Sequence, residues 1–399
     1  MKNVILMNVD ELWLKGRNRG QYAKLLKKHI RKSCRLFLEN YSLKNENQRI
    51  VLRTEETIGE SFFDELKRIP GIYSLQRARE ASLDEEEIKK VCLEEFEFCL
   101  SKNPDIKTFK VETKRVNKTF PKGSMEFSRE LGSVILKKYG HFLSAKMKNN
   151  DCDIQVKINQ QNAFITSHKE LGIGGLPVSS SGYGLTMLSG GFDSPVASYK
   201  MITRGMHQTF VFFHAYPFVG DEVKEKIVTL AKKIASYQQG GLLLVFPFGE
   251  LQKLISKKCR EDYRTMLFRW AMMKACRHVA EFVNTSAIIT GDSLGQVSSQ
   301  TLENMSLMDK ASDQIILRPL IGSSKREIIE IAEKIGTHDI SIIPHDDACS
   351  LFAPKNPVIR PHLGYWAEIT SELEEEVNQL CVNLLQSSER ISLSNIPKS

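Results

Sequence analysis

The sequence lacks several features that would assign it to a common class of protein. None of its eight cysteines stands in a CxxC pair, which excludes a zinc ribbon and a CxxC redox site. Its longest apolar stretches, such as GLLLVFPF, are about as long as a strand and far below the ~20 residues that a membrane-spanning helix needs. Asp10 and Glu11 interrupt the apolar N-terminus, and no cleavage-site pattern follows. We therefore expect a cytoplasmic protein without membrane segments or a disulfide framework, with cysteines that are mostly buried.

Positive charge is concentrated at the start of the chain. The 399 residues carry 56 Lys and Arg against 48 Asp and Glu, a formal net charge of +8. Residues 1–58 and 105–148 each have a net charge of +7, whereas residues 59–104 have −4 and the remaining residues are near neutral. A basic N-terminal portion on a near-neutral C-terminal portion favours a polyanion-binding module joined to a second activity. The alternative is that surface lysines merely keep the protein soluble.

The periodicity of apolar residues divides the chain into successive regions. Residues 1–58 contain the strand-like run NVILMNV and a segment whose apolar residues recur at helical spacing beside a basic face. Residues 59–170 alternate helix-like and strand-like runs, which predicts an α+β fold. Residues 171–184 are rich in glycine and serine, as expected of a linker. An amphipathic helix and a polar tail are expected after 370.

From residue 185 onward, apolar strands alternate with helical segments. This pattern predicts a doubly wound α/β domain with a parallel sheet covered on both faces, over residues 185–370. The expected strands are GLTML (184–188), TFVFFHA (209–215), GLLLVFPF (241–248), SAIITG (286–291) and QIILRPL (314–320).

The turn SGGFDSP follows the first of these strands and precedes a helix. Gly190 and Gly191 permit backbone conformations and close approaches that a side chain would block. Ser189 and Ser194 add hydroxyl groups. Because ligands of open parallel sheets bind at the carboxyl ends of strands, beside helix N-termini, the turn predicts a phosphate site. It matches neither GxxxxGK[ST] nor GxGxxG. A glycine-rich turn of no chemical consequence is the alternative.

Ser-Gly-Gly-x-Asp-Ser is the signature of the ATP pyrophosphatase (PP-loop) group, which splits ATP between its α and β phosphates. Longer strings resemble the tRNA 4-thiouridine synthetase family (ThiI). ELWLKGRNR resembles its ferredoxin-like segment, TFKVETKRVNKTFPKGSMEFSRELG its THUMP RNA-binding domain, and TGDSLGQVSSQTLENM its downstream nucleotide motif. The resemblance covers nearly the whole chain. It implies a ferredoxin-like domain at 1–58, a THUMP domain at 59–170, a linker at 171–184, a PP-loop domain at 185–370, and a C-terminal helix and tail at 371–399.

The resemblance implies ATP-dependent transfer of sulfur to C4 of uridine 8 in tRNA. Adenylylation of O4 turns a poor leaving group into a good one and releases pyrophosphate. ATP and Mg²⁺ are the implied cofactors, and Asp193 would hold Mg²⁺, position the loop or cap its helix. Lys325 is expected to be a second phosphate ligand or a solvated lysine. The remaining nucleotide-binding residues that are expected are Met187, Leu188, Ser189, Gly190, Gly191, Ser194, Phe212, Phe213, Arg269, Gly291 and Gln300.

Sulfur transfer needs a carrier thiol, and the candidate is Cys349 in PHDDACSLFAPKNP. The family's loop often carries two adjacent cysteines, and the first of these positions is Ala348 here. If the essential thiol belongs at 348, the assignment of Cys349 fails. We expect the short form of the family, without the rhodanese domain that carries a second active cysteine. No metal centre built from protein ligands alone is expected, because the lack of CxxC argues against an iron–sulfur variant.

The expected partners are tRNA, a cysteine desulfurase as sulfur donor and a second copy of the chain in a homodimer. A thiamine sulfur-carrier protein is a further candidate, although the missing rhodanese domain argues against it. Two other functions stay open: a PP-loop amidotransferase or ligase acting on a small metabolite, and a non-catalytic tRNA-binding protein. Basic residues expected to contact RNA phosphates are Lys15, Arg17, Arg19, Lys110, Lys114, Arg115 and Lys118.

Overall fold

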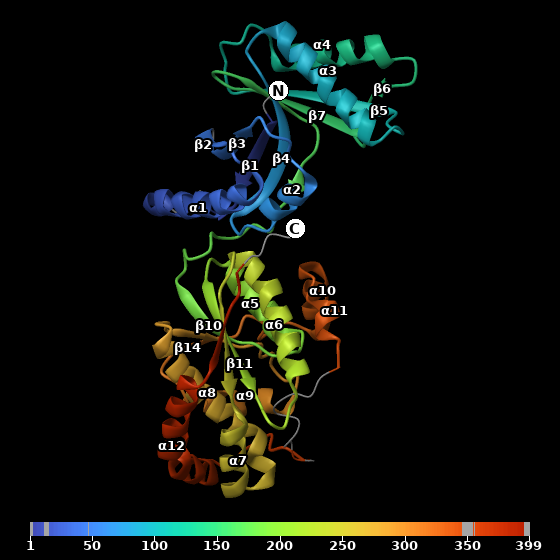
Figure 1. Ribbon diagram of the computed structural model, residues 1–399. Helices are drawn as coiled ribbons and strands as arrows, with labels where there is room; N and C mark the ends of the chain where they lie inside the picture. The colour runs from blue at the N-terminus through green and yellow to red at the C-terminus, as the bar shows by residue number, and fades with distance from the viewer. Residues whose placement is uncertain (1–2, 12–15, 47, 345–353, 355, 395–399) are drawn as a thin grey trace. The chain divides into compact units, whose positions relative to one another are not determined.

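The computed structural model describes residues 3–11, 16–46, 48–344, 354 and 356–394 (Figure 1). The chain divides into two compact units, unit 1 (Met1–Leu176) and unit 2 (Pro177–Ser399). No helix in these described ranges has both the length and the apolar character that a membrane crossing requires.

The first part of unit 1 is an antiparallel sheet covered by two helices. The strands have the order β2-β3-β1-β4 and the elements follow one another as βαββαβ, which is the ferredoxin-like arrangement. Apolar residues alternate along β1, so that Ile5 and Met7 face the core under the helices while Val4 and Leu6 lie on the other face. The elements are β1 (Asn3–Val9), α1 (Arg19–Phe37), β2 (Ser42–Glu46), β3 (Arg49–Thr54), α2 (Glu60–Lys67) and β4 (Ile72–Ala81).

The second part of unit 1 extends the same sheet through β4. This strand pairs with β1 along most of its length and with β8 through Arg79–Ala81, and the order continues β4-β8-β7-β5-β6. Phe96, Phe109 and Phe127 fill the core between this part of the sheet and its helices. The elements are α3 (Glu85–Lys102), β5 (Thr108–Arg115), α4 (Ser124–Tyr139), β6 (Ser144–Ala145), β7 (Cys152–Ile158), β8 (Ala163–Thr166) and β9 (Glu170–Leu171).

Unit 2 contains a six-stranded sheet with the order β14-β13-β10-β11-β12-β15. All five strands expected from the sequence are present and parallel, which confirms the predicted fold class. The order in which strands are added to the sheet reverses at β10: β11 and β12 lie on one side of it, and β13 and β14 lie on the other. Such a reversal leaves a crevice at the carboxyl end of the first strand. The strands are β10 (Tyr183–Met187), β11 (His207–His214), β12 (Leu242–Pro247), β13 (Ala287–Ile289), β14 (Ile315–Leu317) and β15 (Glu389–Ser392).

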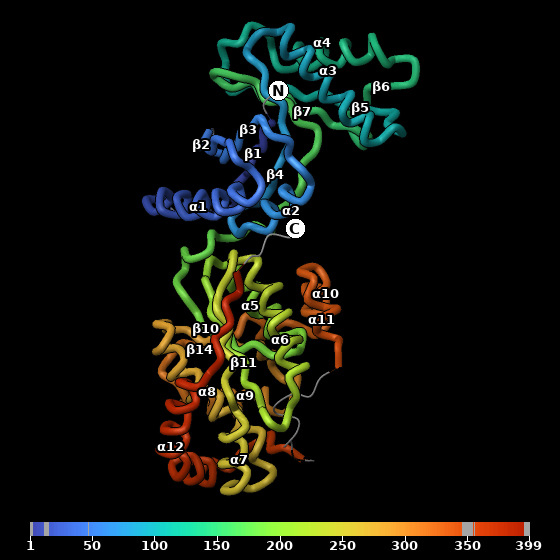
Figure 2. The backbone as a smooth tube through the Cα atoms, in the orientation of Figure 1, coloured from blue at the N-terminus to red at the C-terminus, as the bar shows by residue number. Residues whose placement is uncertain are grey.

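The helices of unit 2 form two groups, one on each face of the sheet, as the chain trace shows (Figure 2). Helix α5 contacts α6 and α10, and α11 contacts α6; on the other face α8 packs against α7, α9 and α12. The helices are α5 (Asp193–Thr203), α6 (Asp221–Ala235), α7 (Gly249–Lys258), α8 (Arg264–Phe282), α9 (Leu302–Asp309), α10 (Lys325–Ile335), α11 (His338–Ser341) and α12 (Leu363–Gln386).

The C-terminal segment differs from the helix and polar tail that its sequence suggests. Helix α12 begins at Leu363, and residues 389–392 form an antiparallel edge strand on β12. Leu393 is buried, and its N–H donates to the Gly241 carbonyl at 2.9 Å. Ile391 is the one large apolar residue in β15, so the side-chain pattern of this segment does not predict a strand. The backbone pairing with β12 explains why the strand forms.

Most of the described cysteines are buried, as predicted. Cys34, Cys92, Cys152, Cys276 and Cys381 are buried, Cys99 and Cys259 are half-buried, and none of these forms a disulfide.

Candidate active site

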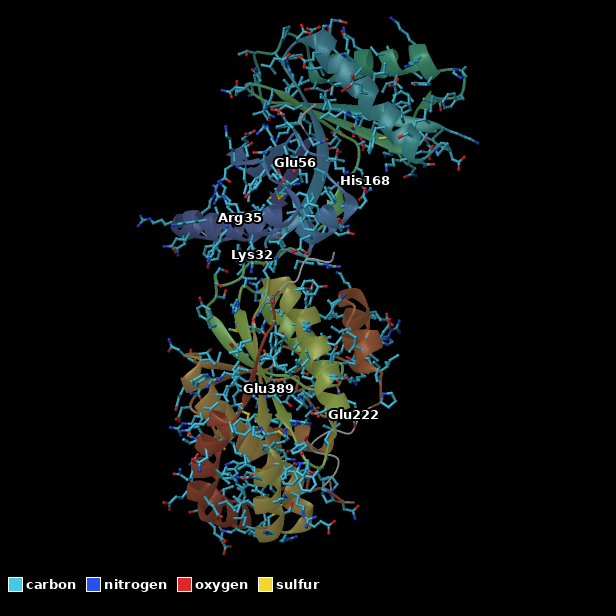
Figure 3. All side chains as sticks on the ribbon, viewed as in Figure 1. Lys32, Arg35, Glu56, His168, Glu222 and Glu389 are labelled. Atoms are coloured by element: carbon cyan, nitrogen blue, oxygen red, sulfur yellow. The ribbon has the colours of Figure 1, made fainter. Side chains whose placement is uncertain are left out.

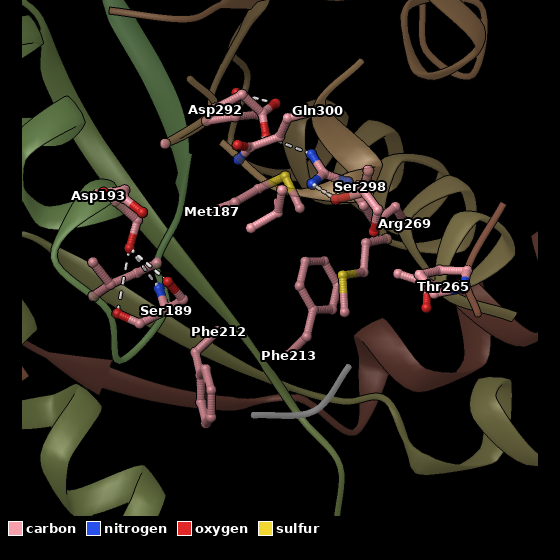
Figure 4. Close-up of a pocket in the computed structure, with 18 of the residues that line it drawn as sticks. Met187, Ser189, Asp193, Phe212, Phe213, Thr265, Arg269, Asp292, Ser298 and Gln300 are labelled. Carbon is pink, nitrogen blue, oxygen red and sulfur yellow. Dashed lines mark hydrogen bonds and ion pairs between the residues drawn. The ribbon is translucent and has the colours of Figure 1, made fainter. Parts of the chain in front are cut away.

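A cavity of about 450 Å³ in unit 2 opens at the carboxyl ends of β10, β11 and β13 (Figure 4). Residues 290–300, between β13 and α9, form one wall, and α8 contributes Thr265, Arg269 and Met272. Ten of the residues predicted from the sequence lie in the lining: Met187, Leu188, Ser189, Asp193, Ser194, Phe212, Phe213, Arg269, Gly291 and Gln300.

The turn between β10 and α5 is held by its two serines. The Ser189 N–H donates to Ser194 Oγ at 2.8 Å, and the two hydroxyl oxygens lie 3.0 Å apart. Neither Gly190 nor Gly191 has a positive φ, so a left-handed backbone conformation is not the reason for these glycines. A Cβ placed on Gly191 would meet no atom within 4 Å. The backbone here is open to close approach by a ligand, beside the N-terminus of α5, where unpaired N–H groups favour an anion.

Gly291 is required for a different reason. A Cβ at this position would lie 2.7 Å from the Ser194 backbone nitrogen and 3.1 Å from Asp193 Cβ. Those distances are too short for any side chain, and the obstructing atoms belong largely to backbone. The absence of a side chain at 291 therefore lets the segment after β13 lie directly against the turn after β10, so that both contribute to one cavity.

Asp193 begins α5 and is held by two donors. Lys325 Nζ lies 2.9 Å from Oδ1, and Gln296 Nε2 donates to Oδ2 at 3.0 Å. Lys325 is the first residue of α10, whose N-terminus is fixed by reciprocal hydrogen bonds between Ser324 and Glu327. Its ammonium also lies over the Phe192 ring, 5.2 Å from the centroid. The structure thus brings two residues 132 positions apart into contact next to the turn.

Part of the cavity wall is apolar. Met187, Leu188 and Phe213 line it, and the Phe213 ring packs edge-on against Phe246 and Phe248. In Figure 4 the Phe212 ring points away from the other labelled side chains, so this residue faces the cavity mainly with its backbone. A flat aromatic ligand would be sandwiched by such walls.

Asp292, which also lines the cavity, is the centre of a buried polar network. It is 4% exposed and lies 2.5 Å from Arg269 Nη2, while Thr290 Oγ1 donates to it at 2.9 Å. Gln300 Nε2 and Arg318 Nε are each 3.4 Å away. Burial opposes ionisation of Asp292, but the Arg269 guanidinium, Thr290 and Arg318 outweigh it and hold its pKa below the usual value.

This network orients two of the predicted nucleotide ligands. Arg269 also donates to Ser299 Oγ at 3.0 Å, so its guanidinium is directed inward and does not extend into solvent from the edge of the domain. Gln300 Oε1 is buried and has no hydrogen-bond partner within the described part of the chain. It is therefore free to accept a hydrogen bond from an amino group of a ligand.

Sequence reasoning missed Asp292 and Gln296. Both stand in the string TGDSLGQVSSQ, from which only Gly291 and Gln300 were selected. A carboxylate directly after the carboxyl end of a parallel strand was a usable signal for Asp292. No local pattern identifies Gln296, because its partner Asp193 is 103 residues away.

Cys349 and Lys15 lie outside the described residues. Pro354 and Pro357, which follow Cys349 in the sequence, line the cavity. Within the described ranges, no cluster of three or more His, Cys, Asp or Glu side chains could hold a metal ion.

The basic residues of unit 1 differ in their availability. Lys110 is 17% exposed and is paired with Glu112 at 2.6 Å, whereas Lys114, which contacts the same carboxylate at 3.1 Å, is 66% exposed. Arg115 donates to the carbonyls of Phe120 and Lys122 at 3.0 and 2.6 Å, which stabilises the loop after β5. Lys118 is exposed. On the N-terminal side Arg17 and Arg19 are exposed, and α1 continues this basic surface through Lys32 and Arg35 (Figure 3).

Three family models match successive parts of the chain. They are the ThiI ferredoxin-like domain at residues 4–75, the THUMP domain at 83–168 and the thiamine biosynthesis protein (ThiI) model at 179–377. A protein of Caldanaerobacter subterraneus subsp. tengcongensis, named "Probable tRNA sulfurtransferase", is 40% identical over 95% of this chain and 96% of its own. A protein of the same name from Halothermothrix orenii is 35% identical over 99% and 100%.

Solved structures agree with this assignment. A crystal structure of a 4-thiouridine synthetase–RNA complex with bound ATP is 30% identical and has a TM-score of 0.91, covering 98% of this chain and 100% of the other. A protein of Pyrococcus horikoshii, 23% identical with a TM-score of 0.64 over 84% of this chain, shares the fold.

The fold and the SGGFDS turn define a PP-loop α/β domain joined to a THUMP-containing unit. With relatives at 35 to 40% identity over nearly its full length, this chain belongs to the ThiI family of tRNA sulfurtransferases.

Replacing Asp292 by asparagine should destabilise unit 2, because Arg269 and Arg318 would lose the charge between them. Removal of one partner of a buried ion pair costs about 3–5 kcal/mol, which lowers the thermal midpoint by at least ~6 °C. The matched control is Asp309→Asn, because Asp309 also contacts Arg318, at 2.6 Å, but is 51% exposed. Its expected cost is below about 1 kcal/mol. Equal midpoints for the two variants would contradict this account of the network.

The destabilisation should also depend on pH. The folded-state pKa of Asp292 is below the unfolded value of about 3.9, so the ionised carboxylate stabilises the fold at every pH above that value. This contribution is lost as the pH falls through the folded-state pKa. The difference in stability between the wild type and Asp292→Asn should therefore be constant near neutrality and should shrink below about pH 4. A difference that grows on acidification would be inconsistent with an ionised Asp292.

Proposed function

We propose that this chain is an ATP-dependent tRNA sulfurtransferase that makes 4-thiouridine at position 8 of tRNA. The observation that carries the proposal is the cavity at the switch point of the parallel sheet. It joins an open glycine turn at a helix N-terminus to an apolar slot with an unpaired amide oxygen. The 4-thiouridine synthetase whose fold this chain matches with a TM-score of 0.91 was crystallised with RNA and ATP.

ATP would lie along the cavity with its two ends in different environments. The triphosphate would contact the backbone at 189–194 and the N-terminus of α5, where unpaired N–H groups favour negative charge. The adenine would lie against Met187 and Phe213, and Gln300 Oε1 would accept a hydrogen bond from its amino group. Arg269, held by Asp292, would contact the ribose or the α-phosphate.

The uracil O4 would attack the α-phosphorus while the bond from that phosphorus to the bridging oxygen of pyrophosphate breaks. Lys325, beside the turn, would move from Asp193 to the departing pyrophosphate and neutralise its charge. Sulfide would then attack C4 and expel AMP directly. With a persulfide as the sulfur source, its terminal sulfur would attack C4 and expel AMP, and a second thiol would then reduce the resulting S–S bond, so that the thiolated tRNA is released and the carrier thiol becomes part of a disulfide. The turn binds the leaving group and the apolar slot keeps the nucleotide in place, so the reaction depends mainly on positioning and charge.

The described residues of this site offer Mg²⁺ one carboxylate at the turn, so most of its ligands would have to come from the substrate and water. Mg²⁺ in nucleotide sites is commonly held by one or two carboxylates together with substrate phosphates and water. Asp193 is the carboxylate at the turn, and it is engaged by Lys325 and Gln296. We propose that Asp193 holds Mg²⁺ when the phosphates are present, and that the ion adds positive charge next to the pyrophosphate.

Cys349 is proposed as the persulfide carrier. Pro354 and Pro357 in the cavity lining support this, because the chain that follows Cys349 contributes to the site. A cysteine desulfurase would supply the sulfur. A thiamine sulfur-carrier protein is proposed as a second acceptor of sulfur, and the working form is proposed to be a homodimer.

The substrates of the proposed reaction, tRNA and ATP, favour a cytoplasmic location for the enzyme.

Purified protein incubated with bulk tRNA, ATP, Mg²⁺ and sulfide should raise the near-ultraviolet absorbance of the tRNA. Asp193→Ala should abolish this rise, because it removes the carboxylate next to the phosphate turn. Asp313→Ala, at a residue that is 80% exposed, is the control and should keep full activity. Turnover of ATP with no dependence on tRNA would favour a ligase acting on a small metabolite, and unchanged activity of Asp193→Ala would refute the assigned site.

Cys349→Ala should lose thiolation driven by a cysteine desulfurase, because no thiol would then accept the persulfide. The control is Cys259→Ala, at a half-buried cysteine outside the cavity lining. Sulfur on each variant can be measured by trapping persulfides after the desulfurase reaction. Full desulfurase-driven activity of Cys349→Ala would show that another thiol, or none, is the carrier.

Among the basic residues of unit 1, Lys114 and Lys118 should matter more for RNA than Lys110. The Lys110 side chain is 17% exposed and contacts Glu112 at 2.6 Å, whereas Lys114 and Lys118 are exposed. Lys114→Ala and Lys118→Ala should each weaken tRNA binding and reduce the slope of log K against log salt by about 1. Lys110→Ala should leave the slope unchanged. Filter binding at several salt concentrations measures this, and equal slopes for all variants would contradict the proposed contacts.

A further inference from the structure

Gln296 is attached to the proposed active site through a single contact. It is half-buried in the segment between β13 and α9, and its Nε2 donates to Asp193 Oδ2 at 3.0 Å. Its Oε1 is buried and has no hydrogen-bond partner among the residues described. A buried amide oxygen without a hydrogen bond lowers the stability of the folded protein. Such a group in a native structure therefore calls for an explanation.

The backbone around Gln296 is closely fixed. Gly295 has a φ of +72°, and its N–H donates to the Gln300 carbonyl at 2.8 Å, which closes a short loop. The Leu294 N–H donates to the Ile321 carbonyl at 3.0 Å. At the start of this segment, Gly291 lies against the turn that contains Asp193. Gln296 therefore reaches Asp193 from a loop that backbone hydrogen bonds hold in place.

The two donors on Asp193 differ in kind. Lys325 is a cation on a flexible side chain that is 45% exposed, and the phosphates proposed above would compete for it. Gln296 is neutral, so a phosphate oxygen does not attract it from the carboxylate in the same way. When Lys325 turns to the pyrophosphate, Gln296 is the donor that remains on Asp193.

We propose that Gln296 is a positioning residue that fixes the Asp193 carboxylate at the phosphate turn during the reaction. The proposal rests on the proposed function of this site. In this proposal Gln296 Nε2 orients Asp193, and Gln296 Oε1 accepts a hydrogen bond from a water molecule that enters with the nucleotide. A positioning residue affects turnover more than nucleotide affinity, because it acts on the reacting geometry.

The test compares Gln296→Leu and Gln296→Glu with the control Gln379→Leu, at an exposed glutamine on α12. Gln296→Leu should lower kcat for tRNA thiolation by about tenfold or more, the effect of losing a hydrogen bond to a charged group, and should change the ATP KM by less than about threefold. Gln379→Leu should behave as the wild type. Unchanged kcat, or a rise in KM alone, would overturn the proposal.

Gln296→Glu supplies a second variant that keeps the length and shape of the side chain. Its ionised carboxylate can only accept hydrogen bonds, so it removes the donor on Asp193 and places a like charge beside it. We expect kcat for tRNA thiolation to fall at least as far as in Gln296→Leu. A kcat at the wild-type level would overturn the proposal, whereas absence of thiolation by the wild type would instead refute the proposed function.

Discussion

The site depends on the close approach of two backbone segments that are about a hundred residues apart. Gly291, after β13, lies against Ser194 and Asp193, after β10, at a distance that no side chain would permit. Neighbouring parallel strands β10 and β13 bring these segments to the same edge of the sheet, and the missing Cβ allows a contact that any side chain at 291 would prevent. Asp292 then lines the cavity and Gln296 reaches Asp193, because both follow Gly291 in sequence.

Two ionic systems on either side of this contact have different characters. Asp292 is buried between Arg269 and Arg318, and breaking that cluster would leave charge without a partner in the interior. Asp193 and Lys325 form a more exposed pair at the start of two helices, and an ion pair of this kind costs little free energy to separate. In the proposed function, the buried cluster forms a fixed part of the cavity wall, and the exposed pair is the one whose contacts change during the reaction.

Much of the fold was predictable from the sequence, and part of the site was not. The strands of unit 2 are short apolar runs with helical segments between them, so their existence followed from local pattern. Strand β15 did not, because its pairing with β12 depends on the edge that β12 offers and not on its own residues. The SGGFDS turn was recognisable as a contiguous motif, whereas Gln296 acquires its role only from a contact across 103 residues. The exposed lysines of unit 1 could not be distinguished from the less exposed Lys110 before their neighbours were known.

If the turn after β10 holds the pyrophosphate, as we propose, the α-phosphorus of ATP is the atom that is attacked. ATP radioactively labelled in its α-phosphate shows which bond breaks, when the nucleotide products formed with and without tRNA are separated. We expect labelled AMP to accumulate only when tRNA and a sulfur source are both present, with pyrophosphate released in equal amount. Labelled ADP as the tRNA-dependent product would contradict it, because the bond broken would then lie between the β and γ phosphates.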